Sequence, residues 1–331
     1  MMRSFAVITN IVALLVIFHL PAHAQPCQNY RCDSLDVRSI LDSAGLISRQ
    51  VDSVTVRDSS TGRIVELHFP EGGGVTSLSG DVGRLAALRQ LWLNMNALSA
   101  LPPEIGNLAS LEGLYIDRNR LSYLPAEIGN LRSLKELFLS GNYLLTALPS
   151  SIGNLTALQT ISLSSCALSQ LPSTIGALSH LTLLAAGNCS LDSVPESMGS
   201  LTALRYLFLT RNDLTTLPGS FTHLVNLQVL DLSRNRLCDL PSALHTWADK
   251  YNPGWESTQD CQTDARTGRI MPVIRASGGP RMTYDLRGRP APFGAKSNAN
   301  APAGVYLVKG PHHRDMVVGM VIGPVAWFER N

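Results

Sequence analysis

The sequence lacks any block of lysine and arginine that could follow a phosphate backbone, and its formal net charge is only +2. Nucleic acid is therefore not an expected partner. Long hydrophobic runs are missing as well, because the apolar stretches at residues 11–18 and 316–328 are too short to cross a bilayer. We expect no integral membrane span. With 45% hydrophobic and 16% charged residues, the chain should form one large globular domain and a smaller one.

Motifs for catalysis are absent from the sequence too. There is no G-x-S-x-G elbow and no H-E-x-x-H helix, and the histidines of the mature chain fall at unrelated positions. His312 and His313 are adjacent in a predicted loop that offers no third metal ligand, so solvated side chains are the favoured interpretation. We expect a protein that is not an enzyme and that holds no cofactor and no metal.

The N-terminal sequence MMRSFAVITNIVALLVIFHLPAHA is typical of a secretory signal. A single basic residue precedes the apolar run, and Ala22-His23-Ala24 forms a small-x-small cleavage site. The alternative is a buried N-terminal helix, which Pro21 and the cleavage pattern disfavour. We expect residues 1–24 to direct export through the Sec pathway, so that the mature chain begins near Gln25 and is secreted or held at the cell surface.

A repeated phrase of 23 or 24 residues fills the middle of the chain. Its frame is L-x-x-L-x-L-x-x-N-x-L followed by x-x-L-P-x-x-I-G-x-L, and a degenerate first copy begins at Ile64. The other copies begin at Leu88, Leu111, Leu134, Leu158, Leu181, Leu204 and Leu227. These eight copies resemble the leucine-rich repeat family over residues 64–246. The resemblance implies an α/β repeat solenoid, a horseshoe with a parallel β-sheet on its concave face.

Each half of the repeat has its own expected role. Alternation in phrases such as LYI predicts a short strand, and the phrase LPxxIGNL predicts a short helical turn on the opposite face, begun by proline and ended by glycine. Asparagines in one column should bond backbone groups of adjacent turns; they are Asn96, Asn119, Asn142, Asn212 and Asn235. Cys166 and Cys189 stand in the same column. One interpretation is that they form a disulfide or a metal pair. The interpretation we favour is that each thiol fills a position of the ladder.

An N-terminal cap is expected at residues 25–63, because a terminal repeat would otherwise expose its apolar side. The sequence there predicts a helix capped by Asp33 or Ser34, followed by a hairpin that leads into the first repeat. We expect Cys27 and Cys32 to pair locally.

A C-terminal cap is expected at residues 247–263, which resemble the closing segment of secreted leucine-rich repeat proteins. Trp247 and Trp255 lie between Cys238 and Cys261. The resemblance implies a disulfide between those two cysteines, which would staple the cap to the last strand.

The remaining residues, 264–331, alternate strand-like runs with Gly/Pro-rich turns and predict a small antiparallel β unit. Two phrases, YDLRGR at residues 284–289 and APAGVYLVKG at residues 301–310, resemble the C-terminal sorting domain of proteins exported by bacterial type IX secretion. The usual Asn-Pro opening phrase of such tails is missing. The alternative is an accessory β-domain.

The outward positions of the predicted strands follow from parity, because successive side chains of a strand point to opposite faces. At the central outward position, Trp92, Tyr115 and Phe138 would form an exposed aromatic row on three adjacent strands. Either this row reflects strand propensity and cross-strand packing, or it is a recognition site. Asp117 and Glu136 could suggest a carboxylate pair for glycoside chemistry, but on an open sheet a hydrogen-bonding surface is favoured.

The sequence therefore predicts an exported, non-enzymatic recognition module that binds a protein or a glycan at the cell surface. The alternative is a structural scaffold of the cell envelope without a discrete ligand. We expect a monomer. The predicted ligand-binding residues of the concave face are Trp92, Tyr115, Asp117, Arg118, Glu136, Phe138, Tyr206, Phe208 and Arg211.

Overall fold

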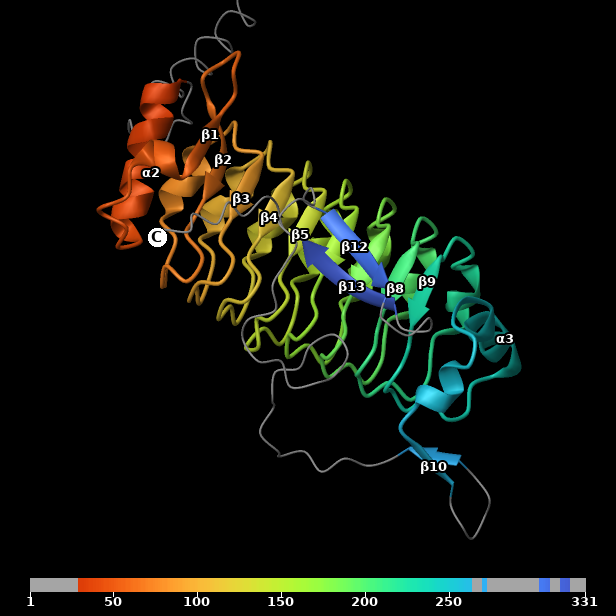
Figure 1. Ribbon diagram of the computed structural model, residues 1–331. Coiled ribbons are helices and arrows are strands. Elements are labelled where there is room, and N and C mark those ends of the chain that lie inside the picture. Colours follow the sequence, from red (N-terminus) through yellow and green to blue (C-terminus); the bar gives the residue numbers. More distant parts are fainter. Residues whose placement is uncertain (1–28, 264–269, 273–303, 310–315, 322–331) are drawn as a thin grey trace, which may run out of the picture. The chain divides into compact units, whose positions relative to one another are not determined.

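The computed structural model describes residues 29–263, 270–272, 304–309 and 316–321 (Figure 1). The chain divides into two compact units, Met1–Val273 and Ile274–Asn331. The predicted signal at residues 1–24 and Cys27, the predicted partner of Cys32, lie outside the described residues. Within the described ranges, no helix combines the length and the apolar character needed to cross a membrane.

The first unit is built on a nine-stranded sheet whose strands follow one another in chain order (Figure 1). Strand β1 (Thr55–Arg57) runs antiparallel to β2 (Ile64–His68), and all later pairs of this sheet are parallel. The later strands are β3 (Gln90–Trp92), β4 (Gly113–Tyr115), β5 (Glu136–Phe138), β6 (Thr160–Ser162), β7 (Leu183–Ala185), β8 (Tyr206–Phe208) and β9 (Val229–Asp231). The predicted solenoid with a parallel sheet on its concave face is confirmed.

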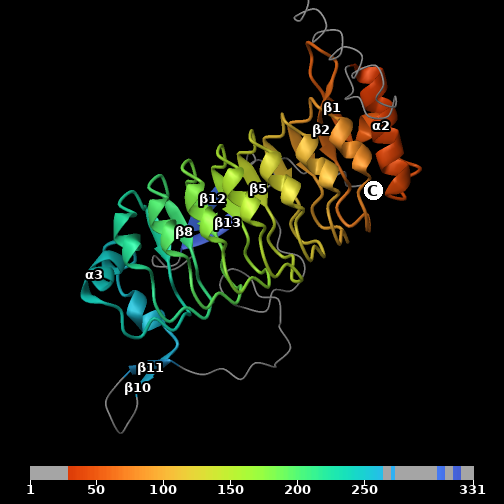
Figure 2. The same ribbon diagram turned by 180° about the vertical axis from the view of Figure 1, so that it is seen from behind.

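Short 3-10 helices line the face opposite the sheet, side by side in the view from behind (Figure 2). They are η3 (Gly80–Arg84), η4 (Pro103–Asn107), η5 (Ala126–Asn130), η6 (Ser150–Asn154), η7 (Ser173–Ala177), η8 (Glu196–Ser200) and η9 (Gly219–His223). The glycine of the frame does not end the turn, as the sequence suggested, but lies inside the helix. A Cβ at Gly106 would lie 2.5 Å from the carbonyl oxygen of Glu127 in the next helix. Glycine is needed there because adjacent helices approach closely.

The interior between the sheet and the helices is filled by the leucines and isoleucines of the frame. In one repeat, Leu91, Leu93, Leu98 and Ile105 are all fully buried. No repeat encloses these side chains alone, so the stability of the solenoid depends on contacts between neighbouring repeats.

The asparagine column forms the predicted ladder. The side-chain oxygen Oδ1 of Asn142 accepts from the Leu121 N–H at 3.1 Å. Its side-chain nitrogen Nδ2 donates to the backbone carbonyl oxygens of Ile116 (3.0 Å) and Leu139 (2.7 Å). The other members of the column bond backbone groups of adjacent turns in the same way; they are Asn96, Asn119, Asn212 and Asn235. These bonds satisfy the polar groups of each bend.

The two cysteines in the column are free thiols. The Cys166 thiol donates to the carbonyl oxygen of Leu139 (3.4 Å), and the Cys189 thiol donates to that of Leu163 (3.3 Å). Burial raises the pKa of both thiols, so they remain protonated donors at neutral pH. Each thiol thus occupies a ladder position.

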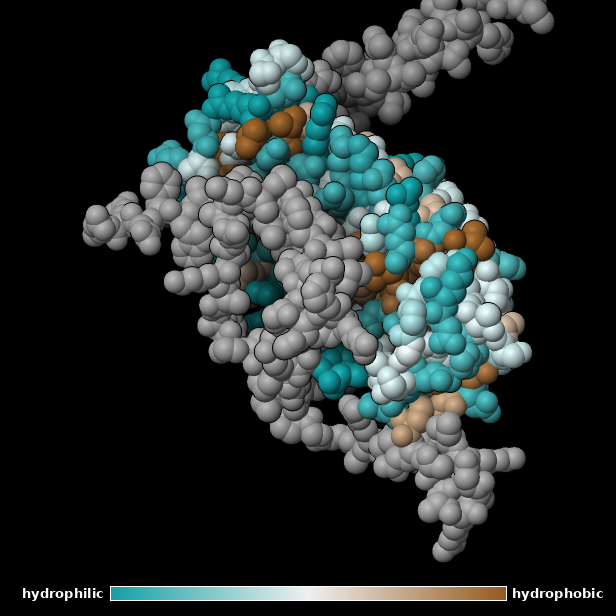
Figure 3. Space-filling model, turned by 45° about the vertical axis from the view of Figure 1, so that its right-hand side comes forward, coloured by the Kyte–Doolittle hydropathy of each residue, from teal (hydrophilic) through white to brown (hydrophobic). Residues whose placement is uncertain are grey.

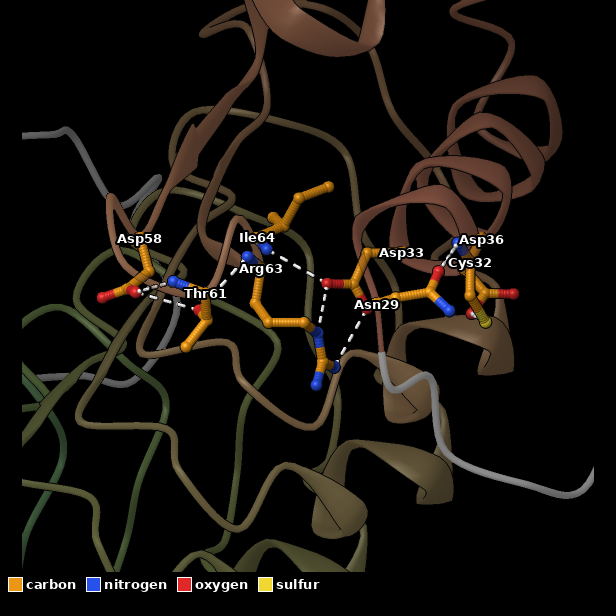
Figure 4. A network of polar contacts seen from close by, with 8 residues as sticks. All are labelled: Asn29, Cys32, Asp33, Asp36, Asp58, Thr61, Arg63 and Ile64. Carbon is orange, nitrogen blue, oxygen red and sulfur yellow. Dashed lines mark hydrogen bonds and ion pairs between the residues drawn. The ribbon is translucent and has the colours of Figure 1, made fainter.

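The N-terminal cap is the helix α2 (Tyr30–Ser43), followed by the 3-10 turn η2 (Val51–Ser53). Asn29, rather than Asp33 or Ser34, caps the helix: its side chain accepts from the Cys32 N–H at 3.0 Å. Asp33 lies inside the first turn, where it is fully buried and bonded to Arg63 and to the Ile64 N–H (Figure 4). The predicted N-cap residue of this helix was therefore wrong. The helix already begins at Tyr30, before both Asp33 and Ser34.

The predicted C-terminal cap, residues 247–263, contains the 3-10 turn η10 (Trp255–Thr258) and the last part of the helix α3 (Ser242–Tyr251), which begins five residues before residue 247. Its Trp247 and Trp255 side chains are buried. Strand β10 (Cys261–Thr263) follows and pairs antiparallel with β11 (Ile270–Pro272). Cys238 and Cys261 are joined by a disulfide with their Cα atoms 5.8 Å apart.

Replacing Cys238 and Cys261 together by serine should lower the free energy of unfolding by about 3 kcal/mol, since the bridge closes a loop of moderate length in the unfolded chain. Urea unfolding of the two proteins measures the difference. Cys189→Ser is the control, because it removes a thiol without breaking a bridge. If Cys238 were recovered as a free thiol from exported protein, the assignment of residues 247–263 as a disulfide-bonded cap would be refuted.

The described part of the second unit is an antiparallel pair of strands, β12 (Gly304–Lys309) and β13 (Met316–Val321). This pair fits the predicted antiparallel β unit. The YDLRGR phrase at residues 284–289 lies outside the described residues, so the sorting role remains a prediction.

Candidate ligand-binding site

A row of four stacked rings crosses the concave face from β2 to β5. The four side chains stand at the same position of adjacent strands, because His68 lies opposite Trp92, Trp92 opposite Tyr115, and Tyr115 opposite Phe138. Ring centroids are 5.5, 3.8 and 5.3 Å apart along the row, and the planes differ by 9°, 14° and 12°. Parity predicted the three larger members. The structure adds His68, which stood at the equivalent position but was not selected as a site residue.

The row is less exposed than the sequence predicted. Trp92 is partly buried, and Tyr115 and Phe138 expose only 6% and 5% of their surface. The expectation of an exposed patch failed for these two rings because it ignored the neighbours. In a parallel stack, each ring of the row covers a face of the next.

Tyr115 lies back along its own strand over Gly113. A Cβ at Gly113 would lie 2.1 Å from the Gln90 side-chain oxygen, 2.7 Å from the Tyr115 hydroxyl and 2.8 Å from its ring. Only a glycine at position 113 leaves space for the Tyr115 ring and the Gln90 side chain. Sequence reasoning missed Gly113, although a glycine at an outward strand position between larger residues is a signal of close approach.

The hydroxyl of Tyr115 donates to Glu136 Oε2 at 2.5 Å. Burial, together with this bond to a carboxylate, raises the pKa of Tyr115 above its ordinary value, so the phenol stays protonated. At the first ring of the row, His68 Nε2 and Glu66 Oε2 are 2.8 Å apart. Carboxylates thus bond the first and the third ring of the row.

Asp117 lies two residues after the end of β4, where the chain turns away from the sheet, and only 7% of its surface is exposed. Its Oδ1 accepts from the Ser140 N–H at 2.7 Å, while its own N–H donates to Asn94 Oδ1 at 3.0 Å. Burial raises the pKa of Asp117 to about 7, against the opposing effects of the Ser140 bond and of the positive charge on Arg118.

Three buried polar atoms of this region have no hydrogen-bond partner among the described residues: Gln90 Oε1, Trp92 Nε1 and Asp117 Oδ2. Two of them belong to β3, and the third belongs to the turn that follows β4. Buried polar atoms in native proteins usually have partners, and an unsatisfied one costs about 1–3 kcal/mol. This end of the concave face therefore holds three buried polar atoms that the described residues leave without a hydrogen bond.

Three of the remaining predicted residues, Tyr206, Phe208 and Arg211, lie apart from this cluster, whereas Arg118 directly follows Asp117. Tyr206 and Phe208 belong to β8, and the equivalents of Phe208 on β6 and β7 are only Ser162 and Ala185. Arg118 and Arg211 have φ values of 54° and 57°, at the bend where the chain leaves the strand. The structure therefore brings together Trp92, Tyr115, Asp117, Glu136 and Phe138, and it places Tyr206, Phe208 and Arg211 in a second group on the same sheet.

Other chemistry is sparse on the described surface. Within the described ranges, no three His, Cys, Asp or Glu side chains are grouped so that they could hold a metal ion. Figure 3 shows hydrophobic areas that are separated by hydrophilic surface. The most exposed apolar side chains, such as Tyr123, Tyr143 and Leu144, lie outside the strands, whereas the exposed Val56 lies in β1.

Comparison with known proteins relates the chain to repeat proteins. The leucine rich repeat family model matches residues 86–144 and 179–237. No curated protein matches the sequence. Among solved structures, the leucine-rich repeat protein LIC12759 of Leptospira interrogans is 30% identical over 53% of this chain and 50% of its own, with a TM-score of 0.42. This chain thus spans half the length of that relative.

Two further structures have higher TM-scores. The PEPR1–AtPEP1 structure is 25% identical over 63% of this chain and 32% of its own, with a TM-score of 0.51. A leucine-rich repeat protein from Bacteroides eggerthii is 15% identical over 64% of this chain and 56% of its own, with a TM-score of 0.53. At that identity, the Bacteroides structure supports the fold alone.

Proposed function

We propose that this chain, which has the leucine-rich repeat fold, is a non-enzymatic recognition module that binds a protein ligand on its concave face. The observation that carries the proposal is the row of stacked rings from His68 to Phe138 beside unpartnered polar atoms of Gln90, Trp92 and Asp117. A rigid sheet that presents aromatic side chains next to unsatisfied donors and acceptors has the properties of a binding hot spot.

The geometry of the row favours a polypeptide over a glycan. Sugars bind to aromatic side chains mainly through an open ring face, but Trp92 and Tyr115 are stacked on each other with centroids 3.8 Å apart. His68 covers the other side of Trp92. Ring edges rather than ring faces are therefore left for a ligand, and these suit peptide groups and side chains. The similar PEPR1–AtPEP1 structure is named for two components, which supports a role in binding.

We also propose that the chain acts outside the cell as a monomer. The signal-like residues 1–24 and the tail phrases that resemble a sorting domain support export. The Cys238–Cys261 disulfide fits an oxidising compartment. A cell-envelope scaffold without a discrete ligand is the alternative, and it predicts that no single substitution on the concave face abolishes an interaction.

Trp92→Ala should weaken the binding of concave-face ligands by about 2 kcal/mol, roughly 30-fold, because a central aromatic anchor is lost. The loss of stacking on Tyr115 should lower stability by only about 1 kcal/mol. Peptides selected from a random display library against the full chain, and hits from a glycan array, supply the ligands. Affinities and thermal melts are compared with those of the wild type.

Tyr123→Ala is the matched control, since Tyr123 is exposed and lies outside the strands. Unchanged affinity in Trp92→Ala, or equal losses in both variants, would show that the row serves packing alone. Hits restricted to glycans would replace the protein ligand by a sugar.

A further inference from the structure

The Asp117 carboxyl group is an exception among the buried side chains of the concave face. One oxygen accepts from the Ser140 N–H, but the other, Oδ2, is buried and has no partner among the described residues. No ion pair joins Asp117 to a cation within the described part of the chain. Arg118 is adjacent in sequence, but its side chain is exposed and lies against Gly141. The second oxygen thus receives no hydrogen bond from the described part of the chain.

The fold does not need a negative charge at this position. One repeat earlier, the neutral side chain of Asn94 makes the same bond, because its Oδ1 accepts from the Asp117 N–H as Asp117 Oδ1 accepts from the Ser140 N–H. An amide would therefore complete the column without the desolvation cost of a carboxylate. A residue that is costly for the fold and unnecessary for it is expected to serve function.

We infer that the Asp117 carboxylate receives the cationic side chain of a lysine or arginine from the protein ligand. The inference rests on the proposed function and names the chemistry of its ligand. A cation at Oδ2 would supply the missing donor, and a charge-assisted bond in this buried setting is among the stronger polar contacts.

The surroundings of Asp117 favour a basic peptide. Glu136 and Glu66 place two further carboxylates on the same face, and neither is paired with a lysine or arginine among the described residues. The Trp92 indole N–H has no acceptor among the described residues, and a peptide carbonyl group that reached it would supply one. The ligand therefore combines a positive side chain with a backbone acceptor, which is what a basic peptide segment offers.

The residues beyond Asp117 in the same column have small side chains. The same column continues with Ser140, Ser164 and Gly187, as the backbone bonds between successive turns show. A peptide that bonds Asp117 could therefore continue along the column toward β9.

The test is a selection of random 12-residue peptides at pH 8 against the full chain, followed by a double-mutant cycle. Each selected peptide is titrated in two forms, with its lysine or arginine intact and with norleucine or citrulline in its place. The protein is used as wild type and as Asp117→Asn. We expect either change alone to weaken binding about tenfold and the second change to add little, because both remove the same ion pair.

Glu127→Gln is the matched control, because it removes a charge from an exposed carboxyl group on η5, away from the strands. It should bind every peptide as the wild type does. Selected peptides without basic residues, or equal affinity in Asp117→Asn, would overturn the inference; if Trp92→Ala still abolishes binding, the proposed function stands. If Trp92→Ala leaves binding intact, or if no peptide is selected, the proposed function itself fails.

Discussion

Asp33→Ala is expected to destabilise the N-terminal cap by about 4 kcal/mol. The buried Asp33 carboxylate accepts from Arg63 Nε at 2.7 Å and Nη2 at 3.0 Å, and from the Ile64 N–H at 3.1 Å (Figure 4). Alanine would remove all three bonds and leave a largely buried guanidinium group without them. Urea unfolding and hydrogen exchange of the α2 amides measure the loss, since an end of a solenoid can open separately from its middle.

Asp42→Ala is the matched control on the same helix. Asp42 also pairs with an arginine, Arg38, at 2.6 Å, but their side chains are 51% and 33% exposed. Such exposed pairs contribute about 1 kcal/mol or less. Equal losses in the two variants would mean that burial adds nothing to the Asp33 pair, and that the cap is anchored mainly by its apolar residues.

The register of the sheet could be predicted because each repeat is one structural unit. A 23- or 24-residue spacing fixes which residues of successive strands lie opposite one another, so Trp92, Tyr115 and Phe138 could be aligned from the sequence alone. The asparagine ladder followed from the same alignment. Long periodic patterns predict structure well because every copy requires the same solution from the chain.

The local chemistry of the site could not be predicted in this way. Parity places a side chain on a face, but it does not say that Tyr115 lies back over Gly113 or that two rings stack with centroids 3.8 Å apart. Asp117 has the parity of an exposed residue and is nevertheless buried, because it turns toward the Ser140 N–H at the bend. These features depend on side-chain torsions, which a repeat pattern leaves open.

The helix cap was missed for a different reason. Asn29, Asp33 and Ser34 are all residue types that cap helices well, so residue type alone could not decide between them. The choice depends on a tertiary contact, because Arg63 holds Asp33 inside the first turn. Sequence periodicity carries no information about such a pair.

The stability of the wild-type protein is expected to fall through Asp117 as the pH rises from about 4 to about 7. Burial raises the pKa of this carboxyl group from its ordinary value of 3.8 to about 7. Between these values the folded state holds the proton and the unfolded state has lost it, so a rise in pH favours unfolding. Above about pH 7 the loss is complete and amounts to about 4 kcal/mol. Below about pH 4 both states are protonated and the group contributes nothing.

Asp117→Asn should remove this dependence, because an amide keeps the bond to Ser140 and carries no charge. The variant should therefore be more stable than the wild type at pH 8 and similar to it at pH 4, as measured by urea unfolding across this range. All other ionisable groups are the same in both proteins, so the difference between the two curves isolates Asp117. Glu127→Gln is the exposed control: it keeps Asp117 and should therefore keep the loss of stability between about pH 4 and about pH 7. A parallel curve for Asp117→Asn would refute the assignment, whereas higher stability with weaker binding of basic peptides would show a carboxylate retained for its ligand.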